Sequence, residues 1–399
     1  MTVLNFEDLS PIQKTIEVEI PADLLTREAN RVTTEFGRQA KVPGFRPGKV
    51  PASVVRTRFS KEIQEEVVQR VLAESFRNIV REKGLDPVGD PLLEHLDPFI
   101  EGAPMKFKAR FEVKPQIELG EYRGLEIDDP KIEVTETDVD AMIERLREQA
   151  SIYRVETDRG LEDGDFAVID IASSGDGVEP KVDSGHFKVG EETPLPELHD
   201  AMRGKTVHHD VTLKEIRVQE KPDVNDEFAK SVGGWDTVDQ MRETIAADIR
   251  RHREMEALRL KRSQLGEKLL ASHEFDVPEA LVEDELGKSL NNYARYLASQ
   301  GVDLQKAEMD WRKMGEEFRP EAVKRVKRSL ILEAIAKKEN IAVSDVEVDA
   351  EIRRAAKEQE REFADVKHHL KHDGGYEALR RSIAQDRALE LVLSEAKSR

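Results

Sequence analysis

The sequence predicts a multidomain α+β protein that is predominantly helical, and three observations lead to this fold class. The chain has 399 residues, which is more than one domain with a single hydrophobic core usually contains, since domains average roughly 150 residues. The composition is 38% hydrophobic and 36% charged with 5% aromatic residues, which favours long solvated helices. Helical periodicity dominates the second half, whereas period-two alternation occurs earlier. We therefore expect a small α+β unit at 1–115, a connector at 116–152, a β-rich unit at 153–220 and an elongated all-α unit with arms at 221–399.

Residues 1–115 are predicted to place two helices on a short antiparallel sheet. Ile16, Val18 and Ile20 alternate with polar residues, which predicts a half-buried strand that ends at Pro21. Apolar and charged side chains alternate at every position of residues 105–113, which predicts a second strand with one buried face. Two helical patterns lie between these strands, the second ending near Gly84. Their apolar positions are Leu25, Ala29, Val32 and Phe36 in the first helix, and Ile63, Val67, Val71, Leu72, Ile79 and Val80 in the second.

The stretch from Lys41 to Pro51, between these helices, differs from its surroundings in turn chemistry and in charge. Its Pro-Gly pairs interrupt regular structure and indicate a compact exposed loop. Phe45 stands among cations, which suits a partner with phosphates and crevices, such as folded RNA with protein at its edge. The alternative is a solvated turn whose Phe45 packs under its own domain. No acid occurs from Phe36 to Lys61, although the chain carries a net charge of −19; the basic residues there are Arg38, Lys41, Arg46, Lys49, Arg56, Arg58 and Lys61.

Residues 44–51, Gly-Phe-Arg-Pro-Gly-Lys-Val-Pro, resemble the G-F-R-x-G-x-x-P signature of the bacterial trigger factor family. These chaperones dock on the ribosome beside the exit of the nascent-chain tunnel. The family commonly has Lys directly after the Arg, where this chain has Pro47. The resemblance implies contact with large-subunit protein and rRNA through Gly44, Phe45, Arg46, Pro47, Gly48 and Lys49.

The connector at 116–152 begins as an extended acidic segment from Ile117 to Pro130. Thr135 to Asp138 then form a predicted capping box that opens a helix. A helix this short needs a surface on which to pack. The family resemblance implies that the connector returns to the C-terminal body.

Residues 153–220 resemble the FK506-binding-protein fold, through the strand 160–171, the strand at Phe187, the short helix 195–204 and the last strand 211–218. Active relatives isomerise X-Pro bonds in a dry aromatic cup that needs no nucleophile, metal or cofactor. Here the matching positions are Ile171, Phe187, Leu195 and Leu198. Because the uncatalysed barrier is about 18–20 kcal/mol, this largely aliphatic cup is expected to isomerise weakly or not at all. The alternative is that these residues are only core.

Residues 221–399 are predicted to be almost entirely helical. A long helix runs from about Val238 to Ala271, a second ends at Gly301, and a third carries Val323 to Ile331. A capping box at Ser344 to Glu347 opens a helix predicted to continue through Ile352, Phe363, Val366 and Leu370, and a last helix follows Gly374-Gly375. Two stripes are either helix core or an adaptable surface for unfolded clients: Met309, Trp311, Met314 and Phe318, and Tyr293, Tyr296 and Leu297.

Several site classes find little or no support. The absence of cysteine excludes disulfides and thiolate metal sites. His368 and His372 stand at i, i+4 spacing, but no acidic ligand set accompanies them, so a solvated helix face is favoured over a metal pair. The basic run Lys324 to Arg328 is either a wet helix face or a site for acidic client segments. No nucleotide motif occurs, and we expect no cofactor and no metal. No basic, apolar leader or 20-residue apolar stretch is present, which predicts a cytoplasmic protein.

Three functions agree with the sequence to different degrees. An ATP-independent chaperone that docks on the ribosome and shields nascent and unfolded polypeptides is preferred, because the loop signature and the long helical arms agree. The alternative is a prolyl cis-trans isomerase acting on unfolded chains. An RNA-binding assembly protein is disfavoured, because the net charge confines nucleic-acid affinity to one patch. We expect no membrane or DNA partner, and the sequence is compatible with a weak homodimer.

Overall fold

The computed structural model describes residues 2–39, 42–43, 45, 50–175, 178–189, 207–304 and 309–398. The chain divides into two compact units. One joins Met1–Asp128 to Lys261–Arg399, and the other is Asp129–Leu260. Helices and strands together make a multidomain, predominantly helical α+β arrangement, which confirms the predicted fold class.

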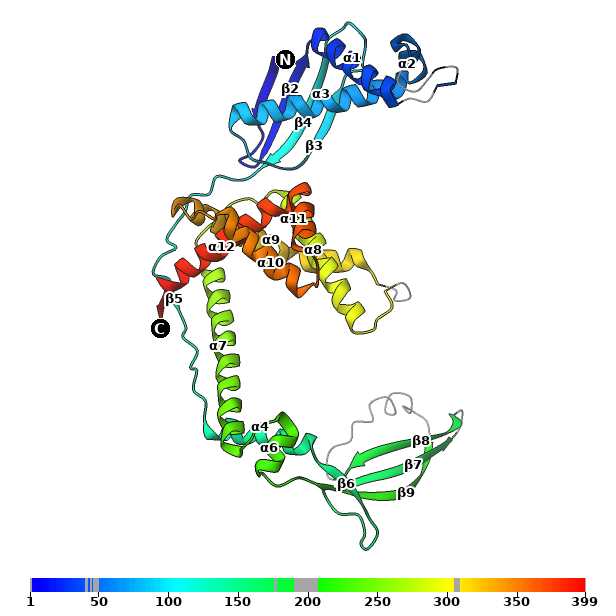
Figure 1. Ribbon diagram of the computed structural model, residues 1–399, viewed down its shortest axis with the longest axis vertical. Helices are drawn as coiled ribbons and strands as arrows, with labels where there is room; N and C mark the ends of the chain where they lie inside the picture. The colour runs from blue at the N-terminus through cyan, green and yellow to red at the C-terminus, as the bar shows by residue number, and fades with distance from the viewer. Residues whose placement is uncertain are drawn as a thin grey trace. The chain divides into compact units, whose positions relative to one another are not determined.

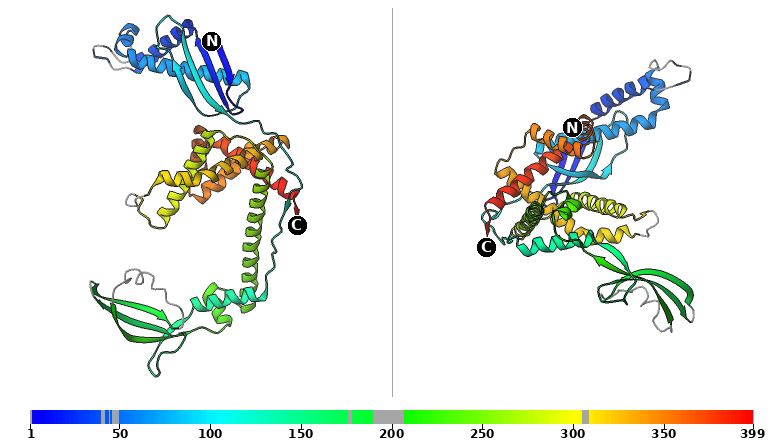
Figure 2. Two further views of the ribbon diagram at one scale, coloured as in Figure 1. Left: turned by 180° about the vertical axis from the view of Figure 1, so that it is seen from behind. Right: turned by 60° about the horizontal axis from the view of Figure 1, so that its bottom comes forward.

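The first unit begins with an antiparallel four-stranded sheet in the order β1-β2-β4-β3, with helices α1 and α3 along one face (Figures 1 and 2). Ile16, Val18 and Ile20 of β2 are fully buried, and β4 buries every second residue as its alternation predicts. The elements are β1 Thr2–Asp8, β2 Gln13–Ile20, α1 Ala22–Gln39, α2 Ala52–Arg58, α3 Ser60–Lys83, β3 Pro87–Leu96 and β4 Met105–Val113.

Three elements of this sheet-and-helix layer were not predicted. Strands β1 and β3 form the two edges, and β3 includes Pro87 and Pro91, which an edge strand tolerates because half of its backbone groups need no partner. The helix α2 has only seven residues and starts directly after Pro51. The expected pair of helices therefore becomes two long helices with a short one between them.

The rest of the first unit is a helical body that the last turns of α7 enter. Its core joins Leu265 and Leu269 to Ile331 and Val392, and Tyr122 from the extended segment 117–128 is buried in the same cluster. The strands β5 and β10, each two residues long, pair in parallel and join this extended segment to the C-terminal end of the described chain. The elements are β5 Glu126–Ile127, α7 Val238–Ala271, α8 Glu279–Ser299, α9 Trp311–Lys338, α10 Asp345–Glu358, α11 Phe363–His372, α12 Gly375–Ser394 and β10 Lys397–Ser398.

The single helix predicted after Ser344 is wrong, because α10 and α11 are separate. The capping box is present, with Glu347 accepting from Ser344 at 2.8 Å. However, Glu360 has a left-handed φ of 52°, and the Arg361 N–H returns to the Ala356 carbonyl at 2.9 Å, which ends the helix. A non-glycine residue takes this conformation, so no sequence signal marked the break.

The second unit combines three helical segments with a sheet. Val139 and Ile143 of α4 pack on Phe228 of α6 and on Met241 and Ile245 at the start of α7. The predicted capping box at Thr135 is formed. The sheet has the order β6-β9-β7-β8, and all its pairs are antiparallel. The elements are α4 Glu136–Gln149, β6 Ile152–Glu156, β7 Phe166–Gly175, β8 Val178–Lys188, β9 Val207–Glu220 and α6 Asp226–Gly233.

Candidate functional site

The basic loop connects α1 to α2, and apolar contacts hold its two ends together. Phe36 of α1 and Phe59, which directly follows α2, have ring centroids 6.1 Å apart. Val55 of α2 is fully buried, and a Cβ atom on Gly37 would lie 3.6 Å from its Cγ2. The two stems of the loop, α1 and α2, therefore meet on the same core that supports the sheet.

At the tip of the loop, Phe45 is 40% exposed while Val42 is buried. The Phe45 N–H donates to the Val42 carbonyl at 3.1 Å, which is a tight turn. Phe45 thus keeps a large part of its ring in solvent. The other predicted site residues, Gly44, Arg46, Pro47, Gly48 and Lys49, lie outside the described residues.

The cations on the stems differ in their partners. Arg56 donates from Nη1 to Glu101 Oε1 at 3.0 Å, and Lys61 lies 3.9 Å from Glu65. Arg38 and Arg58 are exposed and form no ion pair with any part of the chain that the structure describes. Glu101 stands 45 residues from Arg56, so no inspection of the local sequence could have found it.

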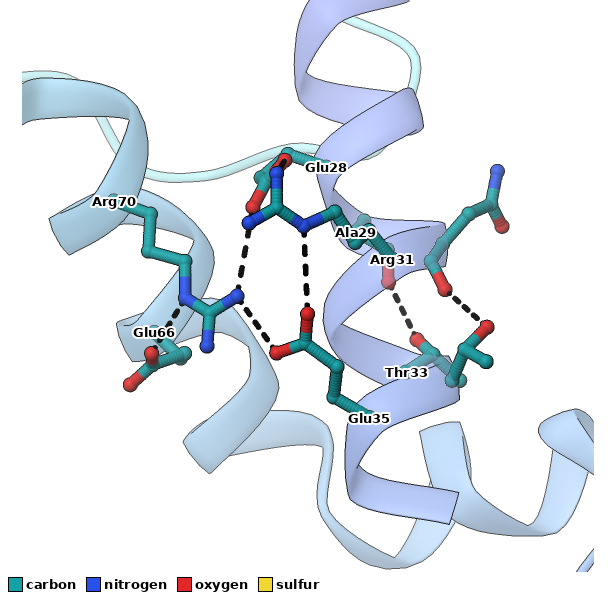
Figure 3. A network of polar contacts seen from close by, with 9 residues as sticks. Glu28, Ala29, Arg31, Thr33, Glu35, Glu66 and Arg70 are labelled. Carbon is teal, nitrogen blue, oxygen red and sulfur yellow. Dashed lines mark hydrogen bonds and ion pairs between the residues drawn. The ribbon is translucent and has the colours of Figure 1, made fainter. Parts of the chain in front are cut away.

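A second charged network joins α1 to α3 (Figure 3). Arg70 of α3 reaches Glu66 on its own helix at 2.6 Å and Glu35 on α1 at 2.7 Å. Arg31 lies 3.4 Å from the other oxygen of Glu35. Hydrogen bonding from Arg70 lowers the pKa of Glu35 below its ordinary value, although burial opposes the shift. The stem α1 is thereby tied to the longest helix of this layer.

The predicted isomerase positions are described only in part. In the backbone register, Ile171 of β7 pairs with Asp183 of β8 and Val211 of β9, and Phe187 of β8 pairs with Ala167. The positions Leu195 and Leu198 lie outside the described residues. The strands that carry Ile171 and Phe187, β7 and β8, are therefore neighbours in this sheet.

The two stripes of large side chains lie on the hairpin of α8 and α9, where some of the side chains are packed and others are exposed. Tyr293 contacts the ring of Phe318 edge-on, with centroids 5.6 Å apart, and Phe318 packs against the hairpin core. Tyr296 is 59% exposed and Trp311 is 37% exposed. Part of each stripe is thus packed, and part remains exposed at the end of the hairpin where α8 connects to α9.

The remaining candidates fall on ordinary helix surfaces. The rings of His368 and His372 are 5.9 Å apart, but the described residues hold no group of three or more His, Cys, Asp or Glu side chains suited to a metal. In the basic run of α9, Arg325 lies 3.5 Å from Glu285 and Arg328 lies 3.8 Å from Glu321. Within the described ranges, no helix has the length and apolar character needed to cross a membrane.

Comparison with known proteins covers nearly the whole chain. The family model for bacterial trigger factor protein matches residues 2–146, and the model for the trigger factor C-terminus matches residues 237–394. Trigger factor of Solibacter usitatus is 33% identical, over 96% of this chain and 96% of that protein. Trigger factor of Anaeromyxobacter dehalogenans is also 33% identical, over 98% of this chain and 99% of that protein.

One solved structure matches over the full length. It comes from work on promiscuous substrate recognition in the folding and assembly activities of the trigger factor chaperone. It is 20% identical, covers 98% of this chain and 100% of that chain, and has a TM-score of 0.48.

Proposed function

This chain belongs to the bacterial trigger factor family of ribosome-associated chaperones, and we propose that its docking site is the loop tip between α1 and α2. The proposed contacts are to large-subunit protein and rRNA at the tunnel exit. Arg46 and Lys49 meet phosphate or acidic protein, and Phe45 fills a pocket. The residues of the docking site are Gly44, Phe45, Arg46, Pro47, Gly48 and Lys49.

The observation that carries the proposal is the exposure of Phe45 between two stems whose cations Arg38 and Arg58 form no ion pair with the part of the chain that the structure describes. The Phe45 ring is 40% exposed and is therefore available to a partner. Arg38 and Arg58 add positive charge and form no ion pair with the described residues. The rest of the chain is acidic, since the net charge is −19, so RNA would be attracted to this end alone.

We propose that each part of the chain has the function that the sequence predicts for it. Residues 1–115 bind the ribosome, 116–152 connect, 153–220 form the isomerase-like domain and 221–399 bind clients. The exposed Tyr296 and Trp311 at the end of the α8 and α9 hairpin support a client surface there. Binding needs no ATP, because adaptable apolar contacts form and break without a chemical step. The compartment that suits this task is the cytoplasm.

We propose that prolyl isomerisation is weak or absent. The support is the sequence at the four cup positions, Ile171, Phe187, Leu195 and Leu198, where one aromatic remains. A protease-coupled assay on a peptide with an X-Pro bond measures this directly. Turnover at the level of active FK506-binding proteins would overturn this part of the proposal.

Cosedimentation with ribosomes across a salt series tests the docking site. We expect binding that weakens with salt and is lost when Phe45, Arg46 and Lys49 are changed together to Ala. A matched control changes Leu92, Lys106 and Lys108 to Ala, which removes one exposed apolar residue and two cations from strands β3 and β4 of the same domain. Binding that survives the first triple change, or that is lost equally in the control, would contradict the assignment.

A further inference from the structure

We propose that Arg56 is a positioning residue for ribosome docking: its guanidinium ties the two stems of the docking loop together and does not contact RNA itself. This inference rests on the proposed docking site. Arg56 belongs to the basic run of the sequence, and from charge alone it would count as one more phosphate ligand. The structure assigns it a different task.

The guanidinium of Arg56 joins three elements. Its Nη1 donates to Glu101 Oε1 at 3.0 Å, and its Nη2 donates to Asn30 Oδ1. Asn30 lies on α1, Arg56 lies on α2, and Glu101 lies in the turn between β3 and β4. Because the loop leaves from α1 and returns into α2, the bond from Arg56 to Asn30 connects its two stems directly.

A cavity of about 330 Å³ opens beside this bridge, and both Arg56 and Glu101 line it together with Thr33, Ser60 and Gln64. The pair of Arg56 and Glu101 therefore lies where side chains leave space. The hydrogen bond from Arg56 to Asn30 adds a polar restraint to the apolar contact between Phe36 and Phe59 at the stems.

The residue types at the three positions suit a bridge. Arg presents donors in a rigid planar fork that reaches two acceptors at once, whereas Lys offers a single point charge. Asn30 occupies an exposed position inside α1, where Asn is less favourable for a helix than Ala, Glu or Lys. Its amide oxygen is used by Arg56, which accounts for its presence.

The two roles for Arg56 make opposite predictions for Glu101. If Arg56 bound phosphate, Glu101 would compete with RNA, and Glu101→Gln would strengthen docking. If Arg56 positions the stems, Glu101→Gln loosens the bridge and weakens docking, even though a negative charge has been removed. The sign of this one effect separates the two roles.

The test measures ribosome affinity of the full-length protein for Asn30→Ala, Arg56→Lys and Glu101→Gln. We expect each variant to bind roughly two- to fivefold more weakly, the scale of an exposed side-chain contact. Asn30→Ala changes no charge, and Arg56→Lys keeps the charge but loses the fork. For Arg56→Gln, we expect the salt dependence of binding to keep its slope, because no phosphate contact is lost; a direct contact would lower the slope by roughly 0.7 to 0.9.

The outcomes separate this inference from the docking proposal. Unchanged affinity in Asn30→Ala and Arg56→Lys, or tighter binding in Glu101→Gln, overturns the positioning role alone, provided that the triple Ala variant at Phe45, Arg46 and Lys49 no longer binds. If that triple variant still binds, both proposals fail. Suppression of client aggregation by the free variants should match wild type, and a loss there would instead show that the variants are misfolded and overturn the positioning role.

Discussion

His273 Nε2 accepts a hydrogen bond from the backbone N–H of Gly120, 3.1 Å away, across 153 positions of the sequence. The other ring nitrogen, Nδ1, lies 2.8 Å from the Leu269 carbonyl. Since Nε2 is an acceptor, the proton is on Nδ1, which donates to that carbonyl. Gly120 permits the close approach, because a Cβ there would lie 3.3 Å from the Ser272 carbonyl oxygen. One side chain thus holds the extended segment 117–128 against the end of α7.

His273→Ala should lower the free energy of unfolding of the helical body by about 1–3 kcal/mol, because it leaves the Gly120 N–H without an acceptor. Faster amide hydrogen exchange in residues 117–128 measures the effect. His369→Ala, which alters an exposed imidazole, serves as the matched control and should change exchange little. Equal protection of the segment in both variants would contradict the role given to His273.

Phe107→Ala should destabilise the N-terminal layer by about 3–5 kcal/mol, since Phe107 is almost fully buried between the sheet and its helices. Amides of β2 and β4 that exchange through global opening of this layer should then exchange about a hundredfold faster or more. Phe45→Ala provides the comparison, because it removes an exposed ring of the same type. A similar effect of both changes on exchange would show that Phe107 is not part of the core.

The pair Arg159 and Asp165 should make the second unit sensitive to acid. Arg159 holds both carboxylate oxygens, at 2.6 and 2.9 Å, and lowers the pKa of Asp165 from its ordinary 3.8 to about 2. A carboxyl group whose pKa falls on folding stabilises the fold above 3.8, and this stabilisation is lost as pH falls to about 2.

The measurement compares wild type with Asp165→Asn by amide exchange in β7 over this pH range. We expect wild type to be better protected at pH 5, with the difference declining toward pH 2. A difference that is constant with pH would mean that the carboxylate charge of Asp165 does not contribute.

Changing Tyr296 and Trp311 to Ser should reduce suppression of client aggregation several-fold, because it removes two exposed aromatic surfaces from the hairpin end. Ribosome cosedimentation should stay at the wild-type level. Tyr293→Ser is the contrasting variant, since Tyr293 contacts Phe318 and its loss should destabilise the hairpin. Full suppression of aggregation by the Tyr296 and Trp311 variant would place the client surface elsewhere.

Local patterns predicted those elements that their own residues specify. Strand β4 follows from strict alternation, α3 ends at Gly84 with a left-handed φ of 64°, and Thr135 caps α4 as its motif indicates. Elements that depend on neighbours were missed or misread. The edge strand β3 has Pro and Gly in place of alternation, and the break between α10 and α11 has no Gly to announce it.

The sequence by itself determined the basic loop: its turn residues, its excess of cations and its aromatic residue are local properties that need no partner to be recognised. Only the tertiary structure decided which of those cations are available. It brings Glu101 and Asn30 to Arg56 and leaves Arg38 and Arg58 without an ion pair among the described residues. The reason is physical: turn propensity acts between adjacent residues, whereas pairing of charges depends on distances that the sheet and its helices set.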